Sequence, residues 1–535
     1  MKNLLLLLLS ILFTPNLSAQ NHHQRFSELD IQHYRFELSL GEKTDQITGT
    51  AHIYFQVKKP VNSIYLDLHQ TRRDGKGMMV NSAALDQQEI KFSQYDDQLH
   101  IKSEEPFVPQ ELYLLEVQYQ GTPADGLIIG RNKFGDRTFF GDNWPNRAHH
   151  WLPTVDHPSD KATVEFVIEA DARYQVVGTG KKLEETTLPS GRRLTHWKTN
   201  VQLPTKVMVF GAAKFAVELA GDVDGIPVTS WVFPENKKEG FYDYAQAVKV
   251  LDWFHTHVAP YPYEKLANVQ SKTRYGGMEN ASNIFYFENS VTGKREREGL
   301  IAHEIAHQWF GNSASEADWH HVWLSEGFAT YFTHLYFEHQ HGREKFVDGL
   351  QTDRTNIIRY AKQNPKSPIV DTRIEDYNQV LSTNTYQKAS WVLHMLRQKV
   401  GTEIFWEGVR AYYQKYQLSN ALTADFKNVM EQVSGQELDD FFQQWIFTPG
   451  VPKVAIDWSY DVAKKMVKLD IQQTAETKHN FPLEIRFADK NGAILGSGMA
   501  EVKAGKVTLS IPATAKPARL LLDPETKVLF SAEVR

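Results

Sequence analysis

The spacing of apolar residues changes twice along this chain of 535 residues. A period of two is typical of strands with one buried face, and a period of about 3.6 is typical of helices. The period is two up to about residue 220, helical from there to about residue 450, and two again beyond it. Because the chain is also too long to fold around one core, we predict three folded domains.

Short alternating runs predict that residues 20–220 form an all-β domain. Two of these runs place an apolar residue at every second position: Tyr34, Phe36, Leu38 and Leu40, then Ala51, Ile53, Phe55 and Val57. One face of each strand is therefore expected to be buried. Turn signals such as Pro189-Ser190-Gly191 separate the runs.

The middle of the chain, residues 221–450, is predicted to be mainly helical with a small sheet. Apolar residues recur at helical spacing in four runs: 241–258, 295–311, 321–341 and 386–400. Gly311 and Gly342 follow two of these runs, where a left-handed helix end favours glycine.

The last part, residues 451–535, is predicted to be a small β-sandwich. Residues 448–452, TPGVP, interrupt the helical pattern. Alternation then returns in two runs: Val454, Ile456, Trp458 and Tyr460, and later Phe481, Leu483, Ile485 and Phe487. The predicted fold class is therefore multidomain α+β.

The first residues have the layout of a secretory signal peptide. Lys2 is positive, residues 4–13 are mostly apolar, and Leu17-Ser18-Ala19 ends in small residues. About ten apolar residues are too few to cross roughly 30 Å of hydrocarbon as a helix. We therefore predict a signal peptide over residues 1–19, export to the periplasm or the exterior, and no stable membrane insertion after signal removal.

The composition narrows the chemistry that the chain can perform. The sequence has no cysteine, which removes thiolate metal sites and cysteine nucleophiles. Its net charge of −6 offers no basic surface for phosphate, so nucleic acid is not an expected partner. Reactive groups must come from His, Asp, Glu, Tyr, Ser or a bound ion.

The strongest chemical signal is the pentapeptide HEIAH at residues 303–307. On a helix, positions i and i+4 lie on one face, so the imidazoles of His303 and His307 can bind one Zn²⁺. Glu304 lies beside them, where it can act as general base on a water molecule. Glu326 lies in the next helical run and can supply an oxygen ligand from a neighbouring helix. We predict one Zn²⁺ per chain, held by His303, His307 and Glu326.

Three motifs resemble those of the gluzincin aminopeptidases related to aminopeptidase N and leukotriene hydrolase. They are YGGMEN at 275–280, HEIAHQWFGN at 303–312 and VWLSEGFATY at 322–331. The resemblance covers nearly all of the mature chain. It implies a thermolysin-like catalytic domain between the two β domains, and a hydrolase that releases N-terminal residues from peptides with a free N-terminus.

The resemblance also assigns roles to further residues. Glu304 would be the general base, and Tyr386 in NTYQK would hydrogen-bond the oxyanion formed during attack. Glu279 would hold the ammonium group of the substrate. The substrate-binding segment would be Gly276, Gly277, Met278, Glu279 and Asn280, on an edge strand that pairs with an extended peptide.

The chain departs from the family pattern at three places. Trp144 stands where relatives usually have Gln or Glu on a loop of the first domain, and Asp142 is a candidate to replace that group. Ser325 precedes the expected metal ligand Glu326, where many relatives carry another polar residue. Many relatives also continue into a large helical domain, so we expect a short, bacterial-like exported member without it.

Two other functions stay open on the sequence. A zinc endopeptidase would need no ammonium pocket at Glu279. A catalytically inactive zinc-bearing binding protein would be expected to lose Glu304 or Tyr386, and this chain keeps both. Epoxide hydrolysis, as in the leukotriene branch, depends on a C-terminal helical part that we do not expect here.

Overall fold

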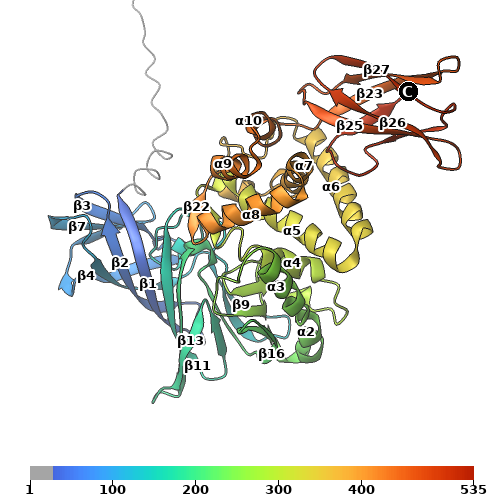
Figure 1. Ribbon diagram of the computed structural model, residues 1–535. Helices are drawn as coiled ribbons and strands as arrows, with labels where there is room; N and C mark the ends of the chain where they lie inside the picture. Colours follow the sequence, from blue (N-terminus) through green and yellow to red (C-terminus); the bar gives the residue numbers. More distant parts are fainter. Residues whose placement is uncertain (1–27) are drawn as a thin grey trace, which may run out of the picture.

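A computed structural model describes residues 28–535, and Figure 1 shows its three parts in chain order. A β-rich part and a small β-sandwich lie at opposite ends of the molecule, with the helices between them. The predicted multidomain α+β fold class is confirmed. The predicted signal peptide lies outside the described residues.

The N-terminal part contains three sheets. The largest has the strand order β13-β14-β11-β1-β2-β8-β4-β5, and its β1–β11 pair is parallel. Its strands are β1 (Leu29–Leu40), β2 (Ile47–Val57), β4 (Gly77–Leu85), β5 (Gln88–Glu89), β8 (Tyr113–Thr122), β11 (Lys161–Asp171), β13 (Lys181–Thr187) and β14 (Arg192–Pro204).

Two smaller sheets complete this part, in the orders β3-β7-β6 and β12-β15-β10-β9. Their strands are β3 (Val61–Asp67), β6 (Phe92–Tyr95), β7 (Gln98–Phe107), β9 (Leu127–Arg131), β10 (Arg137–Gly141), β12 (Gln175–Gly178) and β15 (Phe210–Ala213). The alternation found in the sequence corresponds to burial, because Tyr34 and Phe36 of β1 and Ile53 and Phe55 of β2 are fully buried.

A five-stranded sheet opens the middle part, in the order β16-β17-β18-β20-β19. Its strands are β16 (Ala216–Val223), β17 (Ile226–Val232), β18 (Leu266–Gln270), β19 (Gly277–Met278) and β20 (Asn283–Tyr286). Strand β16 crosses the predicted boundary at residue 220 and pairs with β17, so by sheet membership this part begins at Ala216. Strand β19 lies at the edge of the sheet, as expected for the segment around Glu279.

Nine α-helices follow or flank this sheet in the described chain. They are α2 (Lys237–Tyr244), α3 (Gln246–His257), α4 (Glu298–Ala306), α5 (Trp323–His341), α6 (Arg343–Gln363), α7 (Ala389–Val400), α8 (Thr402–Tyr416), α9 (Thr423–Ser434) and α10 (Asp439–Phe442). A short sheet pairs β21 (Ala314–Glu316) with β22 (Ser419–Ala421). None of the described helices is long and apolar enough to cross a membrane.

Helix α4 is shorter than the run 295–311 that the sequence predicted. It ends at Ala306, and His307 caps it. The chain then turns back on itself, with the backbone N–H of Asn312 donating to the carbonyl of His307 and Gly311 at a φ of +118°. Gly342, which follows α5, also has a positive φ of +88°, where glycine avoids the strain of a side chain.

The C-terminal part is a sandwich of two sheets, ordered β27-β24-β23-β29 and β26-β25-β28. The strands are β23 (Lys453–Asp461), β24 (Met466–Gln473), β25 (Phe481–Ala488), β26 (Ile494–Val502), β27 (Lys506–Pro512), β28 (Arg519–Leu522) and β29 (Ser531–Val534). Hydrogen bonds attach it to the helices. Arg354 of α6 donates to Asp523, and His394 of α7 lies 2.8 Å from the carbonyl of Thr526.

Candidate active site

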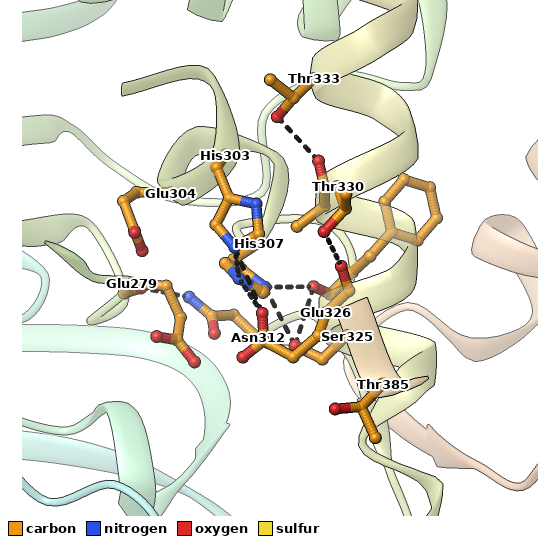
Figure 2. A network of polar contacts seen from close by, with 12 residues as sticks. Glu279, His303, Glu304, His307, Asn312, Ser325, Glu326, Thr330, Thr333 and Thr385 are labelled. Carbon is orange, nitrogen blue, oxygen red and sulfur yellow. Dashed lines mark hydrogen bonds and ion pairs between the residues drawn. The ribbon is translucent and has the colours of Figure 1, made fainter. Parts of the chain in front are cut away.

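Helices α4 and α5 bring the three expected metal ligands together. His303 Nε2 and His307 Nε2 lie 3.1 Å apart, and each lies 3.2 Å from Glu326 Oε2. Figure 2 shows both imidazoles facing the Glu326 carboxylate across the gap between the helices. The contact is buried, since the side chain of Glu326 is 6% exposed and that of His307 is 1% exposed.

The triangle of donor atoms fits a zinc ion. Ligands placed tetrahedrally at about 2.0–2.1 Å from Zn²⁺ stand about 3.3 Å from one another, close to the three distances found here. Two imidazole nitrogens and one carboxylate oxygen are donors that zinc accepts. Three protein ligands would leave a fourth position for water or substrate.

Ser325 fixes the orientation of one ligand. Its Oγ lies 2.9 Å from His307 Nδ1, and the carbonyl of Phe310 lies 3.2 Å from the same nitrogen. A proton on Nδ1 can therefore be donated to these oxygens, which leaves the Nε2 lone pair free for a metal. Gly311 permits this packing, because a β-carbon there would be 2.1 Å from Ser325 Oγ. The sequence marked Ser325 only as a departure and gave it no role.

Burial favours the uncharged form of all three ligands, whereas their attraction for neighbouring charged groups favours the charged form. The balance, and hence the direction of the pKa shift, differs from ligand to ligand. At His307 the carboxylates of Glu326 and Glu279 outweigh burial and raise the pKa to about 10. At Glu326 the two histidines outweigh burial and hold the pKa of the carboxyl far below its usual range. At His303 burial prevails and lowers the pKa. Glu326 is therefore an anionic oxygen donor at neutral pH.

Glu304 lies beside the triangle and is not part of it. It is buried, and burial raises its pKa well above the usual range, with the Glu279 and Glu326 carboxylates adding to the effect against His307. Gly277 of the edge strand leaves room for it, since a β-carbon there would be 2.2 Å from Glu304 Oε1. From this position the carboxyl of Glu304 can exchange a proton with a group bound beside the donor triangle.

Tyr386 lies against His303 in the same cavity lining. It belongs to a short helical turn, Asn384–Lys388, that leads directly into α7. Its ring stacks on the imidazole of His303 with the ring centres 5.9 Å apart and the planes 14° from parallel. Burial, together with the carboxylates of Glu326 and Glu279, raises the pKa of its phenol well above the usual value. The hydroxyl therefore keeps its proton and can donate a hydrogen bond.

Glu279 directly follows strand β19 and faces the same space. One of its carboxylate oxygens lies within 4.8 Å of ligand atoms of Glu304 and His307. Its backbone carbonyl accepts hydrogen bonds from Gln308 Nε2 at 2.8 Å and from Asn312 Nδ2 at 2.6 Å, which fixes the end of the strand against the turn that follows α4. Its Oε1 is buried without a hydrogen-bond partner among the described residues, so it is available to a ligand.

A cavity of about 380 Å³ joins these groups. Gly276, Gly277 and Met278 line it with Glu279, as expected, whereas Asn280 is buried behind them with both amide atoms unpartnered in the described chain. Four further lining residues were not assigned to substrate binding from the sequence, because they belong to none of its motifs or lie at a motif edge: Trp144, Tyr275, Leu300 and Leu381.

The structure does not bring Asp142 into this cavity. Its side chain is fully buried, with Oδ1 accepting from Arg147 at 2.9 Å and Oδ2 accepting from the backbone N–H of Arg274 at 3.2 Å. Burial raises its pKa although Arg147 opposes this. Trp144 lines the cavity in its place, packed edge-on against Tyr275 and Trp319.

Comparison with known proteins agrees with this geometry. The Peptidase M1 N-terminal domain matches residues 31–207, and the Peptidase family M1 domain matches residues 242–445. These two domains of one family together cover most of the chain. The chain belongs to peptidase family M1. The resemblance predicted from the three motifs is thereby confirmed.

Individual relatives of this M1 chain are distant. Glutamyl aminopeptidase of Sus scrofa is 24% identical over 475 residues, which are 84% of this chain and 50% of that protein. Leucyl aminopeptidase of Saccharolobus solfataricus is 25% identical over 414 residues, or 74% and 51% of the two chains. This M1 chain spans about half the length of the curated relatives it matches.

The crystal structure of an M1 zinc metallopeptidase from Deinococcus radiodurans shares the fold. Its TM-score is 0.67 at 24% sequence identity, over 78% of this chain and 94% of that one. The fold of this M1 chain is therefore found in other members of the family.

Proposed function

We propose that this chain is a zinc-dependent aminopeptidase that releases the N-terminal residue of peptides. The observation that carries the proposal is the buried, unpartnered Oε1 of Glu279 beside the donor triangle. A buried carboxylate oxygen without a hydrogen-bond partner is costly, and the cationic amine of a peptide would compensate it. Such an anchor limits cleavage to the first peptide bond, because it lies next to the metal ligands.

Each group of this chain has a task in that reaction. Zinc, one ion per chain, would be held by His303, His307 and Glu326, and would supply a Lewis acid for the carbonyl and for water. Glu304 accepts the proton of the attacking water and delivers it to the leaving amine. Tyr386 donates a hydrogen bond to the carbonyl oxygen as negative charge develops on it.

The edge strand positions the peptide for this chemistry. An extended peptide can pair with the free edge of β19, and Gly277 lets the strand itself come close to Glu304. Glu279 fixes the amine, so the bond that follows is held over the general base.

The cavity favours an apolar first residue. Trp144, Met278, Leu300 and Leu381 line it, and none of its described lining residues is a lysine or an arginine. An acidic side chain would therefore lose water without gaining a cation. We propose that leucyl or aromatic N-termini are cleaved faster than glutamyl ones, which a panel of aminoacyl reporters measures directly.

We also propose that the protein is exported. The support is the charged start, apolar stretch and small residues of positions 1–19. N-terminal sequencing of protein from separated cell fractions tests this. A chain that begins at residue 20 and is found outside the cytoplasm is expected, whereas an intact Met1 in the cytoplasm would refute export.

The function is tested with one peptide in two forms, free and N-acetylated, on native protein and on Glu279→Ala. We expect the native protein to prefer the free peptide and the variant to lose activity on it, mainly through a higher KM. Chelation should abolish hydrolysis, and zinc should restore it.

Three outcomes would contradict the proposed function or its mechanism. Equal effects of Glu279→Ala on both peptides would favour a zinc endopeptidase. Binding of peptide without hydrolysis would favour a zinc-bearing binding protein. Full activity of metal-free protein would refute the zinc mechanism.

A further inference from the structure

Gly277 on strand β19 and Glu279, which directly follows the strand, fix the direction in which a bound peptide lies. Glu279 receives the amine, and Gly277, two positions earlier, lies against the Glu304 carboxylate. The peptide therefore runs antiparallel to β19. Its leaving part points past Gly277 toward Gly276 and the loop of residues 272–276.

A second hollow, of about 390 Å³, opens at that loop. Tyr275 and Gly276 line both the hollow and the active-site cavity, so the two adjoin. Unlike the cavity, the hollow has two cationic side chains in its lining, Lys272 and Arg274. Among the described residues that line these two spaces, lysine and arginine therefore lie beside the substrate only after the cleaved bond.

Among the described residues that line the hollow, one side chain is acidic, and it is already compensated. One carboxylate oxygen of Glu288 accepts a hydrogen bond from Lys272 Nζ at 3.1 Å. The other oxygen accepts one from the backbone N–H of Lys133 at 2.5 Å. This carboxylate therefore does not need Arg274, and Lys272 is already occupied by it.

Arg274 retains unused donors. One terminal nitrogen, Nη2, donates to Asp125, and its backbone N–H donates to Asp142. Asp125 in turn is shared with Arg147, whose Nη1 lies 3.6 Å from it. A guanidinium carries five N–H donors, and this side chain is 50% exposed. Its remaining donors can bind a second carboxylate, for which a guanidinium is well suited.

We propose that Arg274 forms a carboxylate-binding subsite for the leaving part of the peptide. The inference rests on the proposed aminopeptidase function and adds a substrate class. Preferred peptides carry a carboxylate within a few residues after the cleaved bond, either as an acidic side chain or as the free C-terminus of a short peptide. Arg274 is a specificity-determining residue in this scheme.

The test compares matched peptides. Leu-Gly-Glu-Gly amide and Leu-Gly-Gln-Gly amide differ in one side-chain charge. Leu-Gly-Gly with a free or an amidated C-terminus differs in the terminal charge. We expect native protein to give at least about a threefold higher kcat/KM for one charged member, mainly through a lower KM, as a partly exposed ion pair can supply. Which pair shows the preference identifies the source of the carboxylate.

Variants assign the effect to Arg274. Arg274→Gln should bring the ratio of kcat/KM between the charged and the uncharged peptide close to one. Arg274→Lys should retain part of the preference, because lysine keeps the charge and loses the planar fork. Arg173→Gln is the matched control. Arg173 is also about half exposed and bound to acidic partners, Glu42 and Asp171, and its ratio should equal that of native protein. High salt should lower the native preference.

The outcomes separate this inference from the proposed function. Leucine p-nitroanilide carries no residue that reaches the hollow, so its hydrolysis by native protein reports aminopeptidase activity alone. If native protein does not hydrolyse this reporter, the proposed function is refuted. Hydrolysis of the reporter with equal rates within both native peptide pairs would overturn the subsite. A preference for the charged peptide that survives in Arg274→Gln would also overturn the subsite. If that variant does not fold, the salt dependence of the native protein decides, and a preference that salt does not change would overturn the subsite.

Discussion

Single residues divide the site into groups that hold a metal and one group that handles protons. His303, His307 and Glu326 form a triangle with sides of 3.1–3.2 Å. Glu304 is adjacent in sequence to the first of them, yet its side chain lies beside the triangle and against Gly277. Its removal should therefore affect chemistry and leave metal binding intact.

Glu304→Gln tests this division. The amide cannot accept the proton of water, so we expect kcat to fall at least about a hundredfold, the usual effect of losing a general base. Zinc content, measured by metal analysis of the same preparation, should stay at one ion per chain. A variant that loses its zinc would show that Glu304 supports the metal instead.

Ser325→Ala tests the support of a ligand. Its hydroxyl lies 2.9 Å from His307 Nδ1, and loss of such an outer contact typically lowers metal affinity about 10–100-fold. We expect a loss near the lower end, because the carbonyl of Phe310 remains as a partner of the same nitrogen. Competition with a chelator measures the zinc affinity directly.

Thr330→Val is the matched control for Ser325→Ala. Thr330 lies on the same helix, and its hydroxyl donates to the backbone carbonyl of Glu326 without touching a ligand side chain (Figure 2). Its zinc affinity should match that of the native protein. Equal losses in the two variants would mean that the helix, and not the His307 contact, sets the affinity.

At the scale of elements, the decisive contact is the approach of edge strand β19 to helix α4. The two glycines before Met278 differ sharply in their surroundings. A β-carbon at Gly277 would be 2.2 Å from Glu304 Oε1, whereas at Gly276 the nearest atom would be Leu300 Cδ1 at 3.8 Å. Only at residue 277 is glycine required for the strand and the helix to come this close.

Gly277→Ala and Gly276→Ala therefore form a matched pair. The added methyl at residue 277 must displace Glu304 or the strand, and we expect kcat to fall about tenfold or more, because small misplacements of a catalytic group are costly. The same change at residue 276 should cost clearly less. Steady-state kinetics on one aminoacyl reporter makes the comparison, and equal losses would show that the close approach does not matter.

At the scale of the whole molecule, the N-terminal part supports the active site through buried lysines. Lys161 of β11 donates to the carbonyls of Asn312 and Ser313, in the turn after α4. Asn312 in turn donates to the carbonyl of Glu279. Lys206 pairs with Glu316 at 2.5 Å, with both side chains almost fully buried. The two parts thus form one unit around the substrate-binding strand.

Lys206→Met should destabilise this unit. It leaves the carboxylate of Glu316 buried without its cation, and breaking a buried pair in this way costs about 3–5 kcal/mol. A lower melting temperature is the expected result. Lys206→Met combined with Glu316→Leu should recover part of the loss, because no charge is then left unpaired.

A surface pair provides the comparison for Lys206→Met. Lys91 and Glu104 lie 3.4 Å apart with side chains 87% and 89% exposed, so Lys91→Met should leave the melting temperature unchanged. A similar decrease in both variants would mean that burial of the Lys206–Glu316 pair contributes nothing to stability.

The sequence by itself determined the features that depend on local periodicity. The i, i+4 spacing of His303 and His307 places two imidazoles on one helix face wherever that helix lies. Alternation in β1 and β2 likewise predicted which side chains are buried. The motifs around Glu279 and Glu326 predicted their neighbourhood through resemblance, and the family match bears out that resemblance.

Only the tertiary structure decided how distant segments use their side chains. The sequence left Asp142 free to bind the substrate amine, but packing commits its carboxylate to Arg147 and gives the cavity wall to Trp144. It gave Ser325 no role, and the crossing of α4 and α5 placed its hydroxyl on His307. The basic hollow at Arg274 also depends on a loop that no local pattern describes. Such contacts join residues far apart in the chain, so their partners are set by packing and not by spacing.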